Sequence, residues 1–516
     1  MTSEPRGWLP LVVLLALVCA LNVALMPASF VGGDSIAWHE EARSLLRDGR
    51  LSVDPQLALH AGDPGEFFVL NEVDRRWYSK HGIANTAMAI PVELAEELAT
   101  GRIPSAGVPP NVLVIDLYNV ALSVALCAVL YGISGSYSRR PVVRAIFTLA
   151  CLYATYLWYY QRAQTSEIYQ TLFFCGAFAL LTTFLRDLRA NDGRATRRGK
   201  WALAGAWACV GMLVLTRLLF ALALPIVIAA VAYEAASTPR ERRARVASAL
   251  APWMVVPPLV ILASLAWANH AKFGSVWLTG YHQWKPREHL PTGNPVDGLR
   301  GFLFDPRYSI LLHFPVLVLA IAGFRPFVAR HRTDALVMLA AFALFLGVTS
   351  MIPTWRGEWG YGPRYLLFLL PVLSLPALCF LDGVADRWGS PRSGLLAAAA
   401  ALLLGYSAYL QVQVNRCDFF AYYFVRNAIP APLDDELTSY FYDHGWGKIC
   451  CDLVAHRADP EHLPFFPAVM RATSARRAGA YRELLVKLLS VDNFYWSSST
   501  SPARGASANR EDAMKR

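Results

Sequence analysis

Charged residues are scarce in this chain, and those present are mostly basic. Asp, Glu, Lys and Arg together occupy 17% of the 516 positions, against 55% for hydrophobic residues, and the formal net charge is +10. The arginines lie mostly in short segments between apolar stretches, which is how membrane topology is encoded. The positive net charge therefore does not indicate a nucleic acid or any other acidic polymer as a partner.

Recognisable metal-ligand spacings are also missing. His39, His81, His282 and His313 form no His-(x)3-His pattern, and no cysteine accompanies them. Zinc sites need closely spaced nitrogen and sulfur ligands, so we expect no structural zinc. The sequence also contains no Asn-x-Ser/Thr acceptor, which agrees weakly with a bacterial inner membrane.

Long apolar runs are what the chain has in abundance. They measure roughly 16 to 22 residues, the length that an α-helix needs to cross a bilayer. The first run is long for a cleaved signal peptide, so we expect it to stay as a helix. The sequence predicts an all-α polytopic membrane protein with about eleven transmembrane helices. The expected spans are residues 8–28, 112–134, 142–160, 167–185, 201–216, 218–235, 250–268, 309–328, 333–352, 364–382 and 393–413.

The basic residues assign a side to each loop. Four short linkers are rich in arginine, and the positive-inside rule places them in the cytoplasm. They carry Arg139, Arg140 and Arg144; Arg186, Arg189, Arg197, Arg198 and Lys200; Arg240, Arg242, Arg243 and Arg245; and Arg325, Arg330 and Arg332. The outer face then receives residues 29–111, residues 269–308 and the tail from position 414. This orientation depends on a turn at Thr216–Arg217, since one long helix through 201–235 would invert everything after it.

The first outer loop, residues 29–111, predicts two helices that lie along the membrane. Trp38 and Ala42 share one face of a helix that ends at Asp48–Gly49, with charged residues opposite. The segment 90–98 similarly sets acidic residues against leucines. Amphipathic helices of this kind lie in the membrane interface, with the polar face toward water.

Asp34 stands where the first apolar run has ended and the first of these helices begins. An Asp at such a place is commonly a helix N-cap. Other polar segments reach the same membrane depth from separate hairpins, so their convergence favours a site, because polar groups there are costly unless partnered or facing a cavity. The candidate residues are Asp34, Lys80, His81, Arg162, Glu167, Arg217, Tyr281, His282, Arg307, Trp355, Arg356, Glu358, Tyr361 and Arg364.

Around these positions the sequence resembles the GT-C superfamily of membrane glycosyltransferases, which includes protein O-mannosyltransferases and the lipid A aminoarabinose transferase. The similarity covers residues 8–413 and rests as much on topology as on motifs. The matching motifs are Gly33-Asp34-Ser35, Tyr78-Ser79-Lys80-His81, Leu215-Thr216-Arg217, the segment from Gly301 to Tyr308, and Trp355 followed by Gly360-Tyr361-Gly362-Pro363-Arg364-Tyr365. The chain departs from the family at Lys80-His81-Gly82, where the family has a Lys-Pro-Pro-type motif.

The resemblance implies an enzyme that takes a sugar from a polyprenyl-phosphate carrier. An acceptor hydroxyl attacks the anomeric carbon with inversion, and Asp34 serves as the general base. Lipid phosphate leaves without a proton if cations spread its charge, so the expected partners are basic. The implied phosphate ligands are Lys80, Arg217, Arg356 and Arg364. Arg217 could equally snorkel to lipid head groups, Arg364 could anchor a helix start, and Lys80 could be an ordinary interfacial lysine.

The remaining candidates would bind or orient substrate. Glu167 would orient the acceptor or, as in some family members, a divalent cation, which is the one cofactor left open; hydrogen bonding at a helix start is the commoner fate of such a residue. Tyr281 and His282 would contact acceptor or sugar, although an aromatic belt also explains a tyrosine there. Arg307 could approach the lipid phosphate, and the aromatics of 355–365 offer flat faces to a sugar.

The tail is expected to form a separate unit outside the membrane. The expected division is 1–413 for the catalytic membrane module, 414–496 for a small extracytoplasmic domain and 497–516 for a disordered end. Ser, Ala, Gly and charges replace hydrophobic residues in that last segment, so it cannot bury a core. Cys417 can pair with either Cys450 or Cys451 in an oxidising compartment.

Together these observations favour a GT-C-type glycosyltransferase of a bacterial inner membrane, with its active site facing outside. Its partners would be a polyprenyl-phosphate-linked sugar, membrane lipids, and a glycan, lipid or protein acceptor of the cell envelope. Two alternatives stay open: a transporter or flippase whose arginines line a path for an anionic lipid or solute, and a polymerase or ligase of lipid-linked glycans. No matched halves or inverted repeat support the transporter, and the late outer loops are short for a ligase, apart from 269–308.

Overall fold

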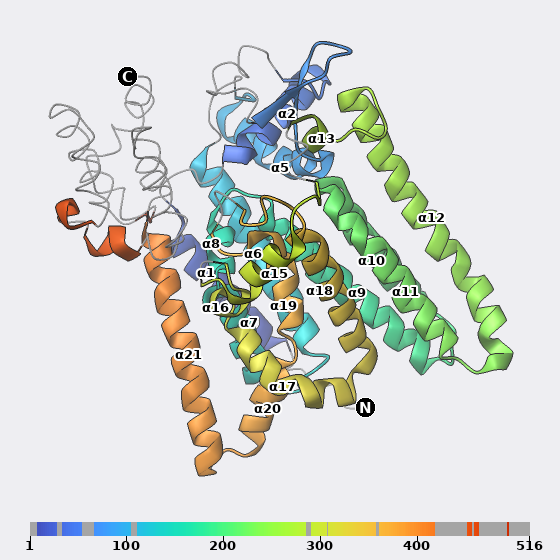
Figure 1. Cartoon of the computed structure of the whole chain (residues 1–516), viewed down its shortest axis with the longest axis vertical. Coiled ribbons are helices and arrows are strands. Elements are labelled where there is room, and N and C mark those ends of the chain that lie inside the picture. The colour runs from blue at the N-terminus through green and yellow to red at the C-terminus, as the bar shows by residue number, and fades with distance from the viewer. Residues whose placement is uncertain are drawn as a thin grey trace.

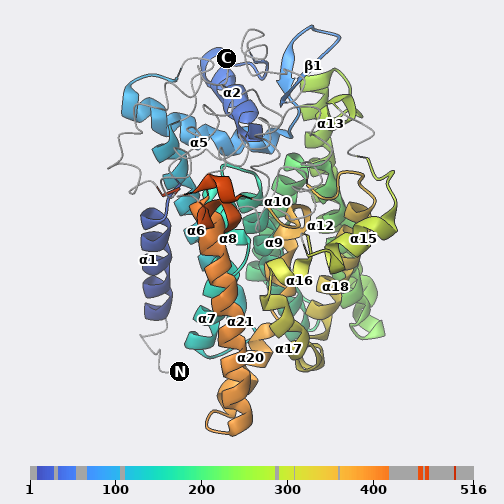
Figure 2. The ribbon, with the colours of Figure 1, turned by 60° about the vertical axis from the view of Figure 1, so that its left-hand side comes forward.

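The chain forms a bundle of long helices covered at one end by a layer of shorter elements (Figures 1 and 2). The computed structural model describes residues 8–27, 33–53, 67–104, 111–284, 290–306, 308–357, 361–417, 451–456, 459–463 and 493–494. Eight helical segments in these ranges are long and apolar enough to cross a membrane. They are α6 (Val112–Ser134), α9 (Glu167–Ala190), α10 (Arg197–Thr216), η1 with α11 (Leu218–Ala236), α12 (Arg240–Phe273), α18 (Arg332–Ser350), η2 with α19 and α20 (Arg364–Asp386) and α21 (Pro391–Arg416).

Three expected spans have shorter helices. They are α1 (Leu9–Ala24), α7 (Pro141–Tyr153) followed by α8 (Leu157–Arg162), and α16 (Ile310–His313) followed by α17 (Val316–Arg330). The Thr155 hydroxyl interrupts the second, because it donates to the Cys151 carbonyl at 2.7 Å and accepts from the Leu157 amide at 3.2 Å. The break between α7 and α8 and the break between α16 and α17 share a hydrogen bond, since the Tyr156 amide donates to the His313 carbonyl at 3.2 Å.

The chain turns between α10 and η1, as the sequence predicts. Arg217 has φ −150° and ψ 135°, an extended conformation that ends the helix. The Phe220 amide then donates to the Arg217 carbonyl at 3.0 Å and starts the 3-10 turn of η1 (Leu218–Leu222). The segment 201–235 is therefore two helices, and an arginine side chain stands between them.

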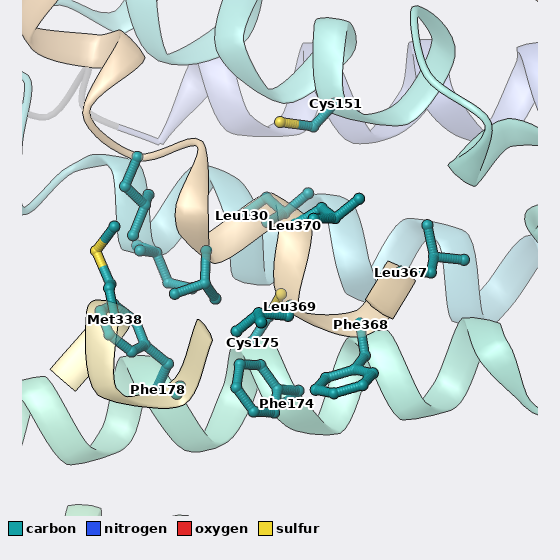
Figure 3. Close-up of a cluster of buried hydrophobic side chains, with 14 of the residues drawn as sticks. Leu130, Cys151, Phe174, Cys175, Phe178, Met338, Leu367, Phe368, Leu369 and Leu370 are labelled. Atoms are coloured by element: carbon teal, nitrogen blue, oxygen red, sulfur yellow. The ribbon is translucent and has the colours of Figure 1, made fainter. Parts of the chain in front are cut away.

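The hydrophobic core of the bundle surrounds η2 (Arg364–Leu369) and α19 (Leu370–Leu373), which pack on α9 and α18. The rings of Phe174 and Phe368 meet edge to face at 4.9 Å between centroids, and Phe345 lies 4.9 Å from Phe368. Figure 3 shows Phe174 and Phe368 beside Leu367, Leu369 and Leu370. This packing fixes the helix that begins at Arg364.

The covering layer comes from residues 33–53 and 67–104 and from the segment after α12. It contains α2 (Gly33–Asp48), the antiparallel hairpin of β1 (Phe68–Leu70) and β2 (Trp77–Ser79), α5 (Ile83–Thr100), α13 (Gly280–Trp284) and α15 (Pro295–Phe304). Both predicted interfacial helices are present, although the second begins seven residues earlier than the expected 90–98 and continues through Pro91. The hairpin was not expected from the sequence.

The polar faces of α2 and α5 do not point to water, which corrects the amphipathic prediction. They face each other: Arg43 Nε lies 2.6 Å from Glu93 Oε2, His39 Nδ1 lies 2.7 Å from Glu93 Oε1, and all three side chains are buried. Leu98 on α5 is instead 89% exposed. Breaking a buried pair of this kind by removing one partner costs about 3–5 kcal/mol, so the network locks the two helices together.

The expected tail domain, residues 414–496, falls mostly outside the described residues, as does the end from 497. Cys417 and Cys451 are both described and form no disulfide with each other, so that alternative is wrong. Cys450 lies outside the described residues, and its pairing with Cys417 stays a prediction. In this part of the chain the structure describes helical residues 451–455 and a short 3-10 turn, η4 (Pro460–His462).

Candidate active site

Asp34 lies in the first turn of α2, and its carboxylate faces the loop that follows β2. Its Oδ1 is 3.3 Å from Lys80 Nζ and 3.5 Å from His81 Nε2. Both partners are almost fully buried, whereas 32% of the Asp34 side chain is exposed. Asp34 is thus more than a helix cap, because it has cationic and imidazole partners and an open side.

The electrostatic environment keeps Asp34 ionised. Burial alone would raise the pKa of its carboxyl, but the charge of Lys80, the interaction with His81 and the more distant Arg364 together hold that pKa well below its usual value. The carboxylate is a proton acceptor at any pH near neutrality.

The loop Lys80-His81-Gly82 is held between two other elements by close backbone approach. A Cβ on Gly82 would clash with the carbonyls of Leu215 and Thr216 at the end of α10. A Cβ on Gly280 in α13 would clash with the Lys80 backbone. Glycine at these two positions therefore lets α10 and α13 enclose the loop.

His81 is fixed by contacts on both faces and at one ring nitrogen. Its ring meets Trp38 edge to face at 5.1 Å and Tyr281 at 5.8 Å, and the Tyr281 hydroxyl lies 3.1 Å from Nδ1. Burial lowers the pKa of His81 to about 4 despite the attraction of Asp34, so the ring is neutral at neutral pH. When Tyr281 donates to Nδ1, the ring proton sits on Nε2, the nitrogen that faces Asp34.

Two arginines from distant parts of the chain complete the cationic side of the site. The guanidinium of Arg217 lies 5.5 Å from the Tyr365 ring centre and that of Arg364 lies 5.2 Å from the same ring. Both arginines interact electrostatically with Glu167, the buried first residue of α9, and Arg364 also with Asp34. The structure thus brings together Asp34, Lys80, His81, Glu167, Arg217, Tyr281 and Arg364 among the predicted candidates.

Other candidates have protein contacts of a different kind. Arg162 is buried and donates to the carbonyls of Leu25 and Asn415 at 2.7 Å each, and to the Asn493 carbonyl. It therefore ties α1 and α21 to the tail. His282 turns toward Thr279, with 2.7 Å between Nδ1 and the hydroxyl.

The described residues on either side of 358–360 are anchored by aromatic side chains. Trp355 is buried against Phe302 and Tyr308, and Tyr361 is buried against a group of tyrosines that includes Tyr156. Arg356 is exposed beside the Trp355 ring. Arg307 and Glu358 lie outside the described residues. The anchored aromatics hold the turn that leads into Arg364.

Four residues of this region were not among the candidate site residues. Trp284 forms a platform under Lys80, whose Nζ lies 3.4 Å from the ring centre, and the Tyr365 ring contacts both Arg217 and Arg364. Glu41 and Lys272 form a buried ion pair beneath the loop. Tyr365 ends one of the matching motifs, and Glu41 follows Asp34 by seven residues and so shares its helix face.

The donor set of the described residues does not fit a divalent cation. No group of three or more His, Cys, Asp or Glu side chains gathers there in ligating positions. Glu167, the residue proposed for such a role, has two arginines as its neighbours. The site's positive charge suits an anion instead.

Comparison with solved structures identifies the fold. No protein-family model and no curated protein sequence matches the chain. ArnT from Cupriavidus metallidurans bound to undecaprenyl phosphate is similar over 99% of this chain and 81% of its own length, with a TM-score of 0.51 and 15% identity. The oligosaccharyltransferase AglB from Archaeoglobus fulgidus, in complex with an inhibitory peptide and a dolichol-phosphate, is similar over 94% of this chain and 60% of its own length, with a TM-score of 0.52 and 11% identity.

These neighbours define the class: the chain has the GT-C fold of membrane glycosyltransferases. The resemblance seen in the sequence is therefore confirmed at the level of the fold. Both neighbours hold a polyprenyl phosphate in their solved complexes, and the apolar helices make this chain an integral membrane protein.

Proposed function

We propose that the protein is an inverting glycosyltransferase that moves a sugar from a polyprenyl-phosphate carrier to an acceptor hydroxyl. One observation carries the proposal: Asp34 is a partly exposed carboxylate 3.3 Å from a buried lysine, with Arg217 and Arg364 close by. A single base surrounded by cations suits a reaction whose leaving group is a phosphate. A glycosidase would need a second carboxyl group to protonate its leaving group.

Each group has a defined part in the transfer. Asp34 accepts the proton of the acceptor hydroxyl while its oxygen bonds to the anomeric carbon. The bond from that carbon to the phosphate oxygen breaks at the same time, and its electron pair leaves with the lipid phosphate. Lys80, Arg217 and Arg364 stabilise this growing negative charge, and the arginines can do so with paired hydrogen bonds.

Donor binding also activates the base. In the free protein the cations hold the pKa of Asp34 low, which makes it a weak base. A bound phosphate compensates part of that positive charge, so the pKa of Asp34 rises when the donor is present. The base therefore becomes stronger in the complex that contains the sugar to be transferred.

A pocket beside this site suits a lipid-linked phosphate. Its polar wall includes Lys80, His81, Arg217, Asn269, Lys272 and Tyr281. Its other wall comes from the ends of α10, η1 and α12 and includes Val214, Leu215, Leu218, Leu265 and Ala268. Cations next to aliphatic side chains at the end of transmembrane helices match an amphiphilic anion. The undecaprenyl phosphate bound to the ArnT neighbour supports this choice of donor.

The position of the basic linkers supports an outward-facing site. The 20 residues of α10 separate Arg197 at its start from Thr216. Thr216 contacts the loop Lys80-His81-Gly82, which we call the catalytic loop. A helix of this length spans about 30 Å, the thickness of the bilayer core. The positive-inside rule then places Asp34 on the outer side of what we propose to be a bacterial inner membrane.

Purified protein in lipid nanodiscs tests the function. Undecaprenyl phosphate carrying a radiolabelled hexose or pentose should lose its sugar to an envelope glycan, lipid or protein, and Asp34→Asn should abolish the transfer. Asp48→Asn is the matched control, because Asp48 ends the same helix with a side chain 47% exposed. Full turnover by Asp34→Asn would refute the mechanism, and vectorial movement of the lipid without turnover would instead indicate a flippase.

A further inference from the structure

A buried ion pair beneath the catalytic loop joins α2 to the end of α12. Figure 1 shows α2 near that end of α12. Lys272 Nζ is 2.9 Å from Glu41 Oε1 and 3.0 Å from Glu41 Oε2. The side chains are 2% and 0% exposed. Burying two charges costs free energy unless both are well bonded. The other hydrogen bonds of the two side chains therefore indicate what the pair does.

The pair holds the catalytic loop on both sides. Glu41 accepts a hydrogen bond from the Ser79 amide, just before the loop, and one from the Thr86 hydroxyl, just after it. Lys272 Nζ donates to the carbonyl of His81, within the loop, at 2.8 Å. The segment that carries Lys80 and His81 is therefore bonded to this pair at three places, twice through its backbone at Ser79 and His81 and once through the Thr86 side chain.

The same helix carries the general base. Glu41 follows Asp34 by seven residues, so the two carboxylates share one face of α2, about 10 Å apart along its axis. Asp34 contacts the side chains of Lys80 and His81, while Glu41 and Lys272 contact the backbone of the same loop. The distance between base and cation thus depends on one helix and one buried ion pair.

We propose that Glu41 and Lys272 are positioning residues, which set the catalytic loop against Asp34 through their hydrogen bonds to the residues of and around that loop. The proposal rests on the function proposed above. A shift of roughly 1 Å in such a site can slow turnover by about 100-fold. Loss of the pair moves Lys80 and His81 away from Asp34, so the charge that holds its pKa low is weakened while its burial remains.

The charged groups around Asp34 fix the direction of the effect. Lys80 and His81 face it from the catalytic loop and Arg364 from η2, and Arg217 and Tyr281 interact with the same cluster from the end of α10 and from α13. Lys80 and His81 are the members whose backbone the ion pair holds. When they move away, the pKa of Asp34 rises. The acidic limb of the rate profile, in which the rate falls as Asp34 becomes protonated, therefore moves to higher pH.

The experiment compares pH profiles of kcat and KM for sugar transfer from labelled undecaprenyl phosphate. The wild type should keep its kcat/KM from about pH 8 down to about pH 5, since kcat/KM reports the free protein, whose base stays ionised there. Glu41→Gln and Lys272→Met should each lower kcat by about 10- to 100-fold and bring the acidic limb into this range. Glu93→Gln removes a buried carboxylate that bonds to Arg43 and His39, and should lower thermal stability without moving the limb.

A double variant keeps the test valid if single variants fail to fold. Glu41→Gln with Lys272→Met leaves no unpaired buried charge and should show the same limb shift. An unshifted limb in a folded variant, with or without a lower kcat, would overturn the proposal and leave the pair as a packing feature. If Asp34→Asn remains active, the proposed function fails instead, which separates the two outcomes.

Discussion

Replacing Lys80 by methionine removes a cation 3.3 Å from Asp34 while keeping an unbranched apolar side chain over Trp284. An opposite charge at this range lowers the pKa of a carboxyl by about 1–3 units, so its loss should raise the pKa of Asp34 by a similar amount. Burial acts in the same direction. The pKa of Asp34 should then exceed the usual value for Asp, and the acidic limb of the rate profile should appear at accessible pH.

The same substitution also removes a proposed ligand of the leaving phosphate. Losing one preorganised charge donor typically slows an enzyme by about 100- to 1,000-fold, or about 3–4 kcal/mol of transition-state stabilisation. Turnover of labelled undecaprenyl-phosphate sugar measures the rate, and quenching of tryptophan fluorescence by undecaprenyl phosphate measures binding, since Trp284 lies under the lysine. Lys80→Arg should recover part of both, because a guanidinium also stacks on an aromatic ring.

Lys200→Met is a suitable control, because Lys200 is exposed near the start of α10, at the opposite end from the site. It should leave rate, binding and pH profile unchanged. A Lys80→Met variant with wild-type turnover, or one that slows while its acidic limb stays in place, would refute the coupling of Lys80 to Asp34.

Two further predictions concern the same loop. Gly82→Ala places a Cβ against the Leu215 and Thr216 carbonyls, so it should lower stability by about 1–3 kcal/mol and slow transfer. Gly132→Ala should be tolerated, because a Cβ there has open space. Equal melting temperatures for the two variants would contradict the packing. His81 has a folded pKa of about 4, below the ordinary value, so the unfolded chain binds the extra proton first and stability falls as pH drops from about 6.5 toward about 4. His81→Gln should flatten that part of the stability curve, and an unchanged pH dependence of chemical unfolding would disprove it.

The sequence was informative where a polar residue interrupts an apolar run. Asp34, Arg217 and Arg364 each stand at the end or start of a transmembrane segment, and a charge at such a place needs a physical reason. The structure gathers them with Lys80 and His81. The same rule also selected Arg162, which bonds to backbone carbonyls elsewhere, because residue type and depth do not reveal the partner.

Residues that act through a distant partner could not be found this way. Glu41 and Lys272 are 231 positions apart, and nothing in the sequence links one to the other: Glu41 lies in a charged stretch of a helix, and Lys272 lies at the end of an apolar run. The polar faces of α2 and α5 were misjudged for a related reason. A charged helix face indicates water only if no second helix with complementary charge covers it, and Glu93 on α5 does cover Arg43 and His39.

Arg162 connects the beginning and the end of the described chain. Its guanidinium bonds at once to the last turn of α1, to α21 and to residue 493. Removing the tail would leave one buried N–H group of Arg162 without its acceptor. The hydrogen bonds of Arg162 to α1 and α21 would then be weakened as well. An inactive shortened enzyme would therefore report a loosened membrane bundle, and it would be wrong to conclude from it that the tail handles substrate.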